Sequence, residues 1–322
     1  MESTRPGRDT VHPFWQRKRV LLTGGAGFVG SAVHKALRRR QVAEERIVIP
    51  RSQSSDLRIL ENCRRAVRGC DVVIHLAAQT GGIAFARSHP ASQYRDCSLI
   101  NLNMFEAARE AGVARFVALG NLLAYPAAAR SPLTEPMLHE GAVAASHMGI
   151  AQVKRDLVML SEMYRREHGL NAICVLGANA YGPGDRFKSE EAHVIPATIR
   201  KCFQEEDLVV WGDGKPTRDF LYVDDLAEGI LLAAETPVLP VCLNIASGSG
   251  VSIAEVVRLI ARLCGFRRRI LFDLSKGSGD PDRLASAALA RELTGFAPRV
   301  PFEEGLERTI RWYRTTILES AA

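Results

Sequence analysis

Short apolar runs alternate with amphipathic segments over the first 182 residues. The apolar runs cover residues 20–22, 46–50, 71–78, 115–120 and 171–182. Between them lie helix-like segments at residues 31–40, 56–68, 91–111 and 149–168. Because the runs are apolar on both faces, each strand is expected to be covered on both sides. The pattern therefore predicts an α/β fold with a doubly wound parallel sheet of the Rossmann type.

The pattern loosens after residue 182. It predicts a helix near 195–205, a strand at 208–211, a hairpin-like turn at 212–216 and a return toward a sheet at 241–247. It also predicts three further helical segments, at residues 252–264, 285–294 and 301–314. We expect a Rossmann-type domain at 18–180 plus about 219–250. A smaller C-terminal domain takes about 181–218 plus 251–322 and lies over the strand ends, where open α/β sheets bind ligands. Residues 1–17 show no periodicity and are expected to form a flexible tail.

Composition is that of a soluble globular protein. The 322 residues are 47% hydrophobic and 24% charged, with a net charge of +6 that fits either a solvated surface or an anionic ligand. Seven cysteines, never spaced C-x-x-C, argue against a disulfide framework and a zinc site. The N-terminus has no apolar signal segment, so a cytoplasmic protein without a membrane partner is expected. The basic triplets 38–40 and 267–269 lack interleaved aromatic residues, so we expect no nucleic-acid partner.

A glycine-rich turn is the first candidate site. Gly24, Gly27 and Gly30 lie between a strand and a helix, where a backbone without side chains can approach a pyrophosphate. The second strand is followed by Arg51 and no acid before Asp56, which favours NADP(H) over NAD(H), although a solvated arginine explains Arg51 equally well. Asp71 is expected either to help hold the adenine or to cap a turn.

Several longer segments resemble extended short-chain dehydrogenases/reductases, the NAD-dependent epimerase/dehydratase family, and most of all its GDP-L-fucose synthase branch. They follow the family order from residue 19 onward: TGGAGFVGSAV, HLAAQTGGIAFARSHPA, NAYGPGDRF, HVIPATIRK, VVWGDGKPTRDFLYVDDLA and FDLSKGSGDP. The resemblance implies a bound NADP(H), a nucleotide-sugar substrate and a homodimer built from two helices of each subunit. It also assigns cofactor contacts to Phe28, Val29, Leu76, Ala77, Ala78 and Lys154.

The resemblance further implies nucleotide-sugar contacts at Asn179, His193, Val194, Lys201, Trp211, Arg218 and Arg283. Arg218 and Arg283 have the chemistry to clamp a diphosphate, and Trp211 offers an apolar face to a base or sugar. The alternatives are a core tryptophan and solvated cations.

The catalytic positions depart from the family pattern. Family members reduce a ketone with serine and Tyr-x-x-x-Lys, whereas here the helix reads Ile150-Ala-Gln-Val-Lys154 and the strand end reads Gly-Asn121-Leu-Leu123. The resemblance places the family's inverting cysteine at Leu123 and a helix asparagine at Cys97. Loss of a general acid costs roughly 10²- to 10⁴-fold in rate, so conventional reductase activity is doubtful.

Four polar residues are candidates to compensate. Asn121 and Tyr125 follow the strand. His147 lies seven residues before Lys154, on roughly the same helix face, but is expected to be solvated. His193 matches the family's proton-transferring histidine. Catalysis is therefore assigned to Lys154 and His193, and substrate binding includes Asn121 and Tyr125. We expect an epimerase/reductase with atypical residues acting on a GDP- or dTDP-linked 4-keto-6-deoxyhexose. An isomerase without net redox and a catalytically silent relative stay open.

Overall fold

Six parallel strands form the main sheet of this computed structural model, which describes residues 12–79, 83–187, 192–204, 207–275 and 282–319. Their order is β2-β1-β3-β4-β5-β9. The strands are β2 (Ile47–Val48), β1 (Val20–Thr23), β3 (Val72–His75), β4 (Arg115–Asn121), β5 (Ala172–Gly177) and β9 (Cys242–Ile245). After β2 the chain returns past β1 to form β3, so the strand order reverses between β1 and β3. This doubly wound parallel sheet confirms the predicted fold class.

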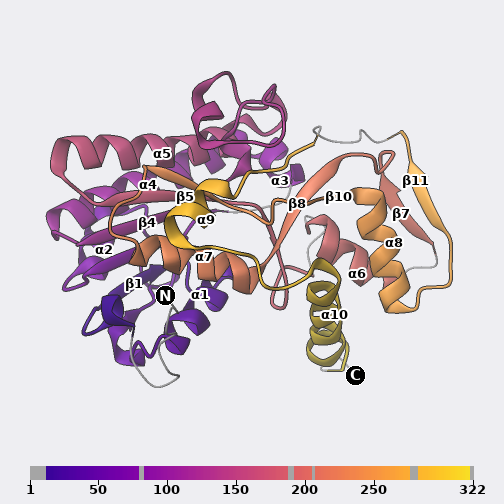
Figure 1. Ribbon diagram of the computed structural model, residues 1–322, viewed down its shortest axis with the longest axis horizontal. Helices are drawn as coiled ribbons and strands as arrows, with labels where there is room; N and C mark the ends of the chain where they lie inside the picture. Colours follow the sequence, from indigo (N-terminus) through magenta and orange to yellow (C-terminus); the bar gives the residue numbers. More distant parts are fainter. Residues whose placement is uncertain (1–11, 80–82, 188–191, 205–206, 276–281, 320–322) are drawn as a thin grey trace, which may run out of the picture.

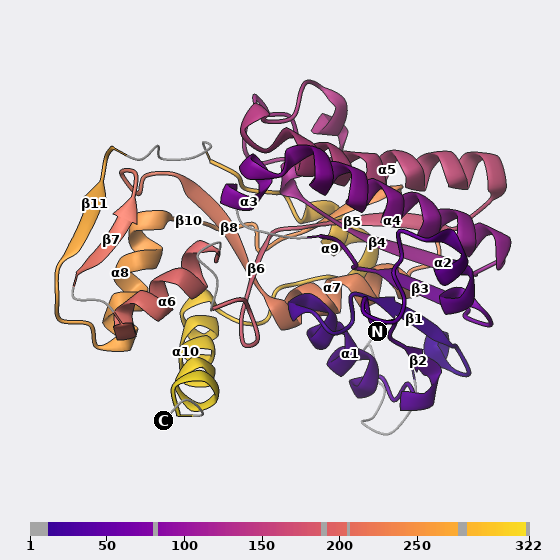
Figure 2. The same ribbon diagram turned by 180° about the vertical axis from the view of Figure 1, so that it is seen from behind.

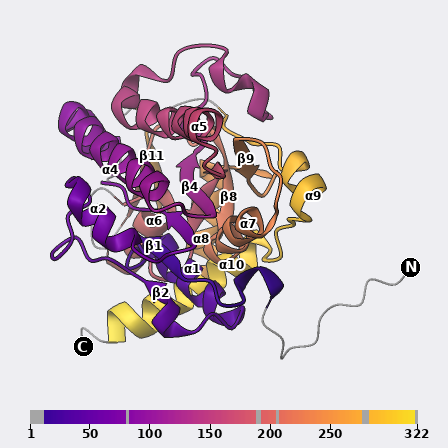
Figure 3. The same ribbon diagram turned by 90° about the vertical axis from the view of Figure 1, so that its left-hand side faces the viewer.

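Helices cover both faces of the sheet (Figures 1 and 3). One face carries α2 (Leu60–Val67), α4 (Pro90–Glu110) and α5 (Met148–His168). The other carries α1 (Phe28–Arg39), α7 (Val223–Glu235) and α9 (Ala288–Thr294). The short helix α3 (Ile83–Ser88), which the apolar pattern did not predict, contacts α4. No described helix combines the length and the apolar character needed to cross a bilayer.

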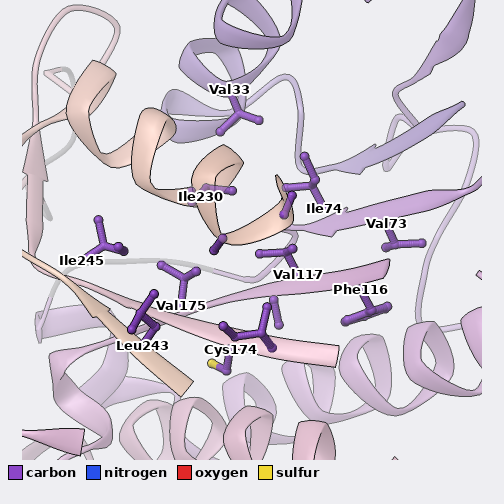
Figure 4. Packing of buried hydrophobic residues seen from close by; sticks show 14 of the residues in the cluster. Val33, Val73, Ile74, Phe116, Val117, Cys174, Val175, Ile230, Leu243 and Ile245 are labelled. Carbon is purple, nitrogen blue, oxygen red and sulfur yellow. The ribbon is translucent and has the colours of Figure 1, made fainter. Parts of the chain in front are cut away.

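The core lies between these helices and the sheet. Figure 4 shows Val33 of α1 and Ile230 of α7 above Ile74, Val117 and Val175 of the strands. All five side chains are fully buried. Burying each such aliphatic side chain contributes about 1.5–3 kcal/mol relative to leaving it in water. These contacts hold α1 and α7 against the strands.

The second half of the chain also forms a smaller lobe, which lies beside the main domain (Figures 1 and 2). Its sheets are β10-β8-β6 and β11-β7. The strands are β6 (Asn179–Tyr181), β7 (Leu208–Trp211), β8 (Thr217–Tyr222), β10 (Gly250–Ser252) and β11 (Ile270–Asp273). The helices are α6 (Val194–Gln204), α8 (Ile253–Cys264) and α10 (Phe302–Tyr313). A second apolar cluster, with Tyr181, Ile199, Ile260 and Leu306 among its members, fills this lobe.

Three details differ from the sequence-based expectation. The run at 171–182 forms two strands, because the chain leaves the main sheet after Gly177 and enters the smaller one at Asn179. Residues 285–296, expected with the smaller domain, contribute Ala290 and Phe296 to the main core. Part of the predicted tail is folded: Trp15 is 1% exposed, and its indole N–H donates to the Glu235 carboxylate at 2.6 Å. Residues 1–11 of that tail lie outside the described residues.

Candidate cofactor and substrate site

The glycine turn after β1 is shaped by backbone contacts that exclude side chains. Gly24 has φ +69°, and a Cβ on Gly30 would lie 2.1 Å from the Gly24 carbonyl oxygen. The Gly27 N–H donates to the same oxygen at 2.9 Å, closing the turn at the start of α1. No side chain caps this helix and no acid occupies its first turn. Its amide groups and positive end are therefore available to an anion such as a pyrophosphate.

The turn faces the end of β3. A Cβ on Gly24 would lie 2.9 Å from the Ala77 nitrogen, so the glycine allows the two loops to approach closely. Leu76, Ala77 and Ala78, the other predicted cofactor contacts of this region, are half-buried, as are Phe28 and Val29 beside the turn. These segments meet where the strand order reverses, which is where open α/β sheets bind dinucleotides.

A buried polar network supports both loops from below. The Thr23 hydroxyl lies 2.8 Å from Nδ1 of His75 and accepts hydrogen bonds from the Leu76 and Ala77 N–H groups at 3.2 Å. His75 Nε2 lies 3.1 Å from Oδ1 of Asn101. Burial lowers the pKa of His75 to about 4, although the Asn101 contact opposes this effect. Neutral His75 therefore accepts from Thr23 and donates to Asn101, which fixes the ends of β1 and β3.

The two charged residues predicted to contact the cofactor, Arg51 and Asp71, lie at different edges of the sheet. Arg51 is exposed in the turn after β2, where its carbonyl oxygen accepts the Ser54 and Ser55 N–H groups at 3.0 and 2.8 Å. Asp71 precedes β3 and accepts the Arg19 N–H at 2.7 Å. It therefore lies at the amino edge of the sheet, opposite the glycine turn, and the adenine-binding prediction for Asp71 is wrong. Its other predicted role was to cap a turn, and this contact instead joins Asp71 to the residue before β1.

Lys154 reaches the main sheet from α5. Its Nζ is buried and donates to the Leu119 carbonyl oxygen of β4 at 3.0 Å. Burial lowers the pKa of the amine, while the nearby thiols of Cys97 and Cys174 raise it. The side chain therefore places a buried cationic donor beside the carboxyl end of β4.

An apolar cluster occupies the place where the resemblance implies the reaction. Its buried members are Ala86, Cys97, Ile150 and Val153, with Ala78 and Leu123 packed against them. The Cys97 thiol accepts the Gln79 N–H at 3.3 Å, which ties α4 to the loop after β3. Neither Ile150 nor Leu123 carries a group that donates a proton. A carbonyl oxygen placed here would find hydrocarbon where the family pattern has a phenol.

Tyrosines elsewhere in the chain do not replace the missing phenol. All six lie within the described residues, and four hydroxyls donate to partners outside this cluster, at Asp156, Asn244, Glu106 and the Phe302 carbonyl oxygen. Tyr222 pairs with Arg308, and Tyr313 is buried in the smaller lobe.

Tyr125 is a core residue. Its hydroxyl donates to Oδ1 of Asn244 at 2.8 Å, and its side chain is fully buried. Burial raises the pKa of the phenol well above its usual range. The prediction that Tyr125 binds substrate is therefore wrong, because this apolar ring and its hydroxyl stabilise the loop after β4.

Two further polar candidates sit near the strand end. Asn121 is half-buried, and its Oδ1 accepts the Leu123 N–H at 3.1 Å, so it caps the single 3₁₀ turn that follows β4. His147, expected to be solvated, is buried at the start of α5, with Nδ1 2.9 Å from the Ser146 hydroxyl. The cap fixes the orientation of the Asn121 side chain.

The predicted nucleotide-sugar contacts gather in the smaller lobe. Asn179 is exposed and donates to the Asp219 carbonyl oxygen at 3.0 Å, and Lys201 donates to the Val209 carbonyl oxygen at 2.9 Å. Trp211 at the end of β7 is 67% exposed, which removes the alternative of a core tryptophan.

Arg218 and Arg283 are backbone neighbours in an isolated parallel bridge. Arg218 is half-buried and donates to the Thr217 carbonyl oxygen at 2.9 Å. Arg283 is buried and donates to the Pro126 carbonyl oxygen at 2.9 Å, joining this lobe to the loop after β4. The two cations therefore come together at the junction of the lobes, and neither is a fully solvated surface charge.

His193 lies just before α6, with Val194 as the first residue of the helix. Its imidazole is exposed and interacts electrostatically with the Asp185 carboxylate. Burial raises the pKa of Asp185, while the Arg186 N–H and His193 oppose that shift. Sequence reasoning did not single out Asp185; its position in the Gly-Pro-Gly-Asp turn before HVIPA was the available signal. It also did not assign a role to Thr23 and Asn101, although His75 inside an apolar strand indicated a buried partner.

Comparisons with known proteins agree with this architecture. Residues 20–246 match the NAD dependent epimerase/dehydratase family. A probable GDP-L-fucose synthase 1 from Oryza sativa subsp. japonica is 31% identical over 94% of each chain. The crystal structure of a GDP-L-fucose synthetase from Naegleria fowleri bound to NADP has a TM-score of 0.83, at 28% identity over 95% of each chain.

The crystal structure of a UDP-glucose 4-epimerase from Thermotoga maritima with UDP-glucose has a TM-score of 0.82 at 26% identity, over 92% of this chain and 99% of that chain. Across the described residues, no group of three or more His, Cys, Asp or Glu side chains is arranged to hold a metal ion. The matched family, the strand order and the glycine turn agree with one another. The chain belongs to the NAD dependent epimerase/dehydratase family.

Proposed function

We propose that this protein binds NADP(H) and a nucleotide-linked 4-keto-6-deoxyhexose, and that it exchanges protons beside the keto group without net reduction. The observation that carries this proposal is the apolar cluster around Ile150 and Leu123. The related GDP-L-fucose synthases and the UDP-glucose 4-epimerase support a nucleotide sugar as the substrate class. A GDP-linked sugar is the first choice, and a dTDP-linked sugar is the second.

The dinucleotide would bind where the strand order reverses, between β1 and β3. The glycine turn leaves room for a pyrophosphate, and the uncapped start of α1 supplies N–H donors. Arg51 supports NADP(H) over NAD(H), because a guanidinium suits a 2′-phosphate and the neighbouring carboxylate of Asp56 is engaged by Arg58. When bound, the nicotinamide supplies hydride chemistry. Lys154 would hold its ribose beside β4.

Ketone reduction needs a proton for the developing alkoxide. Ile150 cannot supply one, and the Asn121 amide can donate a hydrogen bond but not a proton at neutral pH. Asn121 would therefore polarise the carbonyl without completing its reduction. This polarisation makes the neighbouring C–H groups more acidic, which is what proton exchange requires.

His193 is the proposed base for that exchange. Imidazole is the side chain most often used for proton transfer, and the His193 ring interacts electrostatically with the Asp185 carboxylate. The base takes a proton from the carbon next to the keto group and returns it to the same carbon. Inversion of that carbon requires a proton from the opposite face, which water would provide because Leu123 offers none.

The smaller lobe would bind the nucleotide. We assign the diphosphate to Lys201, Arg218 and Arg283, and the base or sugar face to Trp211. Asn179 and Val194 complete the site. We also propose a domain boundary near residue 180, with residues 285–296 assigned to the main domain. The nucleotide site would then lie beyond the carboxyl ends of the main-sheet strands, where open α/β sheets bind ligands.

A homodimer is also proposed, through the outer faces of α4 and α5. Large apolar side chains on these two packed helices are exposed, namely Tyr94, Leu99, Leu102, Met159 and Met163. Exposed apolar side chains on neighbouring helices are expected where a partner covers them.

The test is an incubation of the protein with NADPH and GDP-4-keto-6-deoxymannose in deuterium oxide. We expect deuterium to enter the sugar beside the keto group while the nicotinamide absorbance stays constant, and His193→Gln to abolish the exchange. Stoichiometric loss of the absorbance would refute the proposal in favour of an epimerase/reductase. Binding of both ligands without exchange would instead establish a catalytically silent relative, the second candidate that the apolar cluster supports.

A further inference from the structure

Two cysteines that the proposed function does not use meet in the smaller lobe. Cys202 lies in the last turn of α6, and Cys264 is the last residue of α8. These helices pack side by side (Figures 1 and 2), and the two thiols hydrogen-bond each other. Cys264 belongs to the buried cluster of the lobe, and Cys202 packs against it while keeping partial exposure.

We propose that Cys202 and Cys264 form a reversible disulfide that links α6 to α8. The contact places the two thiols next to each other, and a sulfur–sulfur bond of about 2.05 Å would draw the ends of the two helices together. The two residues come from elements that are distant in sequence, and the link would therefore fix the relative position of two helices.

The surroundings give the two thiols different roles. Cys202 is reachable from solvent, whereas Cys264 is 9% exposed. The hydrogen bond with Cys202 and burial raise the pKa of Cys264, and the nearby Arg314 guanidinium opposes that shift. Arg314 also donates to the Cys264 carbonyl oxygen at 3.2 Å. Cys202 is therefore the attacking thiol, and Cys264 is the resolving thiol.

The oxidant is a small-molecule disulfide such as glutathione disulfide. The Cys202 thiolate attacks one of its sulfur atoms and releases one glutathione thiolate, which takes up the proton lost by Cys202. The Cys264 thiolate then attacks Sγ of Cys202 in the mixed disulfide and releases the second glutathione, which takes up the remaining proton. The protein loses two electrons and two protons, and the oxidant gains them as two thiols.

The chain contains a matched comparison pair. Cys174 and Cys242 are register partners in β5 and β9, so their side chains are also neighbours. Both are buried in the main core, and burial raises the pKa of each to about 12. Neither thiol is accessible, so this pair is expected to stay reduced under conditions that oxidise Cys202 and Cys264.

Formation of the link is tested on the folded full-length protein with glutathione disulfide, followed by alkylation and peptide mapping. We expect a peptide pair joined at Cys202 and Cys264, its reversal by dithiothreitol, and alkylated Cys174 and Cys242. Cys202→Ser and Cys264→Ser should each abolish the joined pair. Alkylation of both Cys202 and Cys264 after oxidation, or a link that forms only in urea, would overturn the proposal.

The consequence for binding rests on the proposed function of Lys201. This residue precedes Cys202, so drawing the end of α6 toward α8 would shift its ammonium group. We expect oxidation to weaken GDP binding by about three- to tenfold, as measured by calorimetry. The GDP affinity of Cys202→Ser should be the same before and after the oxidant is added. A disulfide with unaltered GDP affinity would refute the regulatory effect. Absence of GDP binding by the reduced protein would refute the proposed nucleotide site, while the peptide map would still decide the disulfide.

Discussion

Ile150 places a hydrocarbon side chain where carbonyl reduction needs a proton. The register that puts Ile150 four residues before Lys154 was readable from the sequence, because both lie in one helix-like segment. The cluster that surrounds Ile150 was not readable, since Ala86, Cys97 and Val153 come from three helices that meet only in the folded chain. Tyr125 was misassigned for the same reason: its sequence position near the strand end does not reveal that its hydroxyl points at Asn244.

Restoring the phenol should restore reduction. The double variant Ile150→Tyr, Asn121→Ser is expected to raise NADPH-dependent reduction of GDP-4-keto-6-deoxymannose by roughly 10²- to 10⁴-fold, because it supplies a general acid beside Lys154. The rate is measured by loss of the nicotinamide absorbance. The matched control is Ile150→Phe, Asn121→Ser, which adds the same ring without a hydroxyl. Equal rates in the two variants, with substrate bound, would contradict this account.

His75 predicts a specific loss of stability in acid. Its folded pKa is about 4 and its unfolded value is about 6.5, so the unfolded chain binds the proton more readily. The free energy of unfolding should therefore decrease by up to about 3 kcal/mol as the pH falls from about 6.5 to about 4.

Urea unfolding at pH 7 and pH 4.5 checks this prediction. His75→Gln removes the titrating group, so its free energy of unfolding should decline less over this pH range than that of the unaltered protein. Parallel declines in the two proteins would show that His75 does not contribute to the acid sensitivity.

The glycine turn is the element whose shape was most completely predictable. Its spacing between a strand and a helix indicated a dinucleotide site, and the close contacts of Gly24 and Gly30 explain why side chains are excluded. Most strands and helices were also predictable, because apolar runs and 3.6-residue periodicity are local signals. The division of residues 171–182 between two sheets was not, because it depends on pairing with β8 and β9.

Substitution of Gly30 by alanine should disrupt the turn. The new Cβ would overlap the Gly24 carbonyl oxygen, so the turn must open, and we expect NADPH affinity to fall by at least about tenfold, the equivalent of one lost hydrogen bond to a charged group. Fluorescence titration with NADPH measures the effect. Gly141→Ala is the control, since a Cβ there makes only ordinary contact with Pro126. Unchanged affinity in Gly30→Ala would place the cofactor elsewhere.

At the scale of the whole molecule, the outer helices α4 and α5 of the main domain stay partly uncovered. A sequence gives the amphipathic period of such helices but not which apolar positions a neighbouring element will cover. Leu102, for example, is 46% exposed although its helix packs against both α2 and α5.

Leu102→Glu should weaken the proposed dimer, because it introduces a charge on this apolar surface. Light scattering coupled to gel filtration is expected to show a dimer of the 35.3 kDa chain for the unaltered protein and a monomer for the variant. Val238→Glu is the control, since Val238 is exposed outside these helices. A monomeric unaltered protein at micromolar concentration would contradict the dimer.

The most direct measurement uses NADPH deuterated at the transferable position of its nicotinamide. The protein is saturated with this cofactor and GDP-4-keto-6-deoxymannose in ordinary water, and the sugar nucleotide is then analysed by mass spectrometry. We expect no deuterium in the sugar, because the apolar cluster supplies no proton to complete hydride transfer. Stoichiometric transfer of deuterium to the former keto carbon would contradict it.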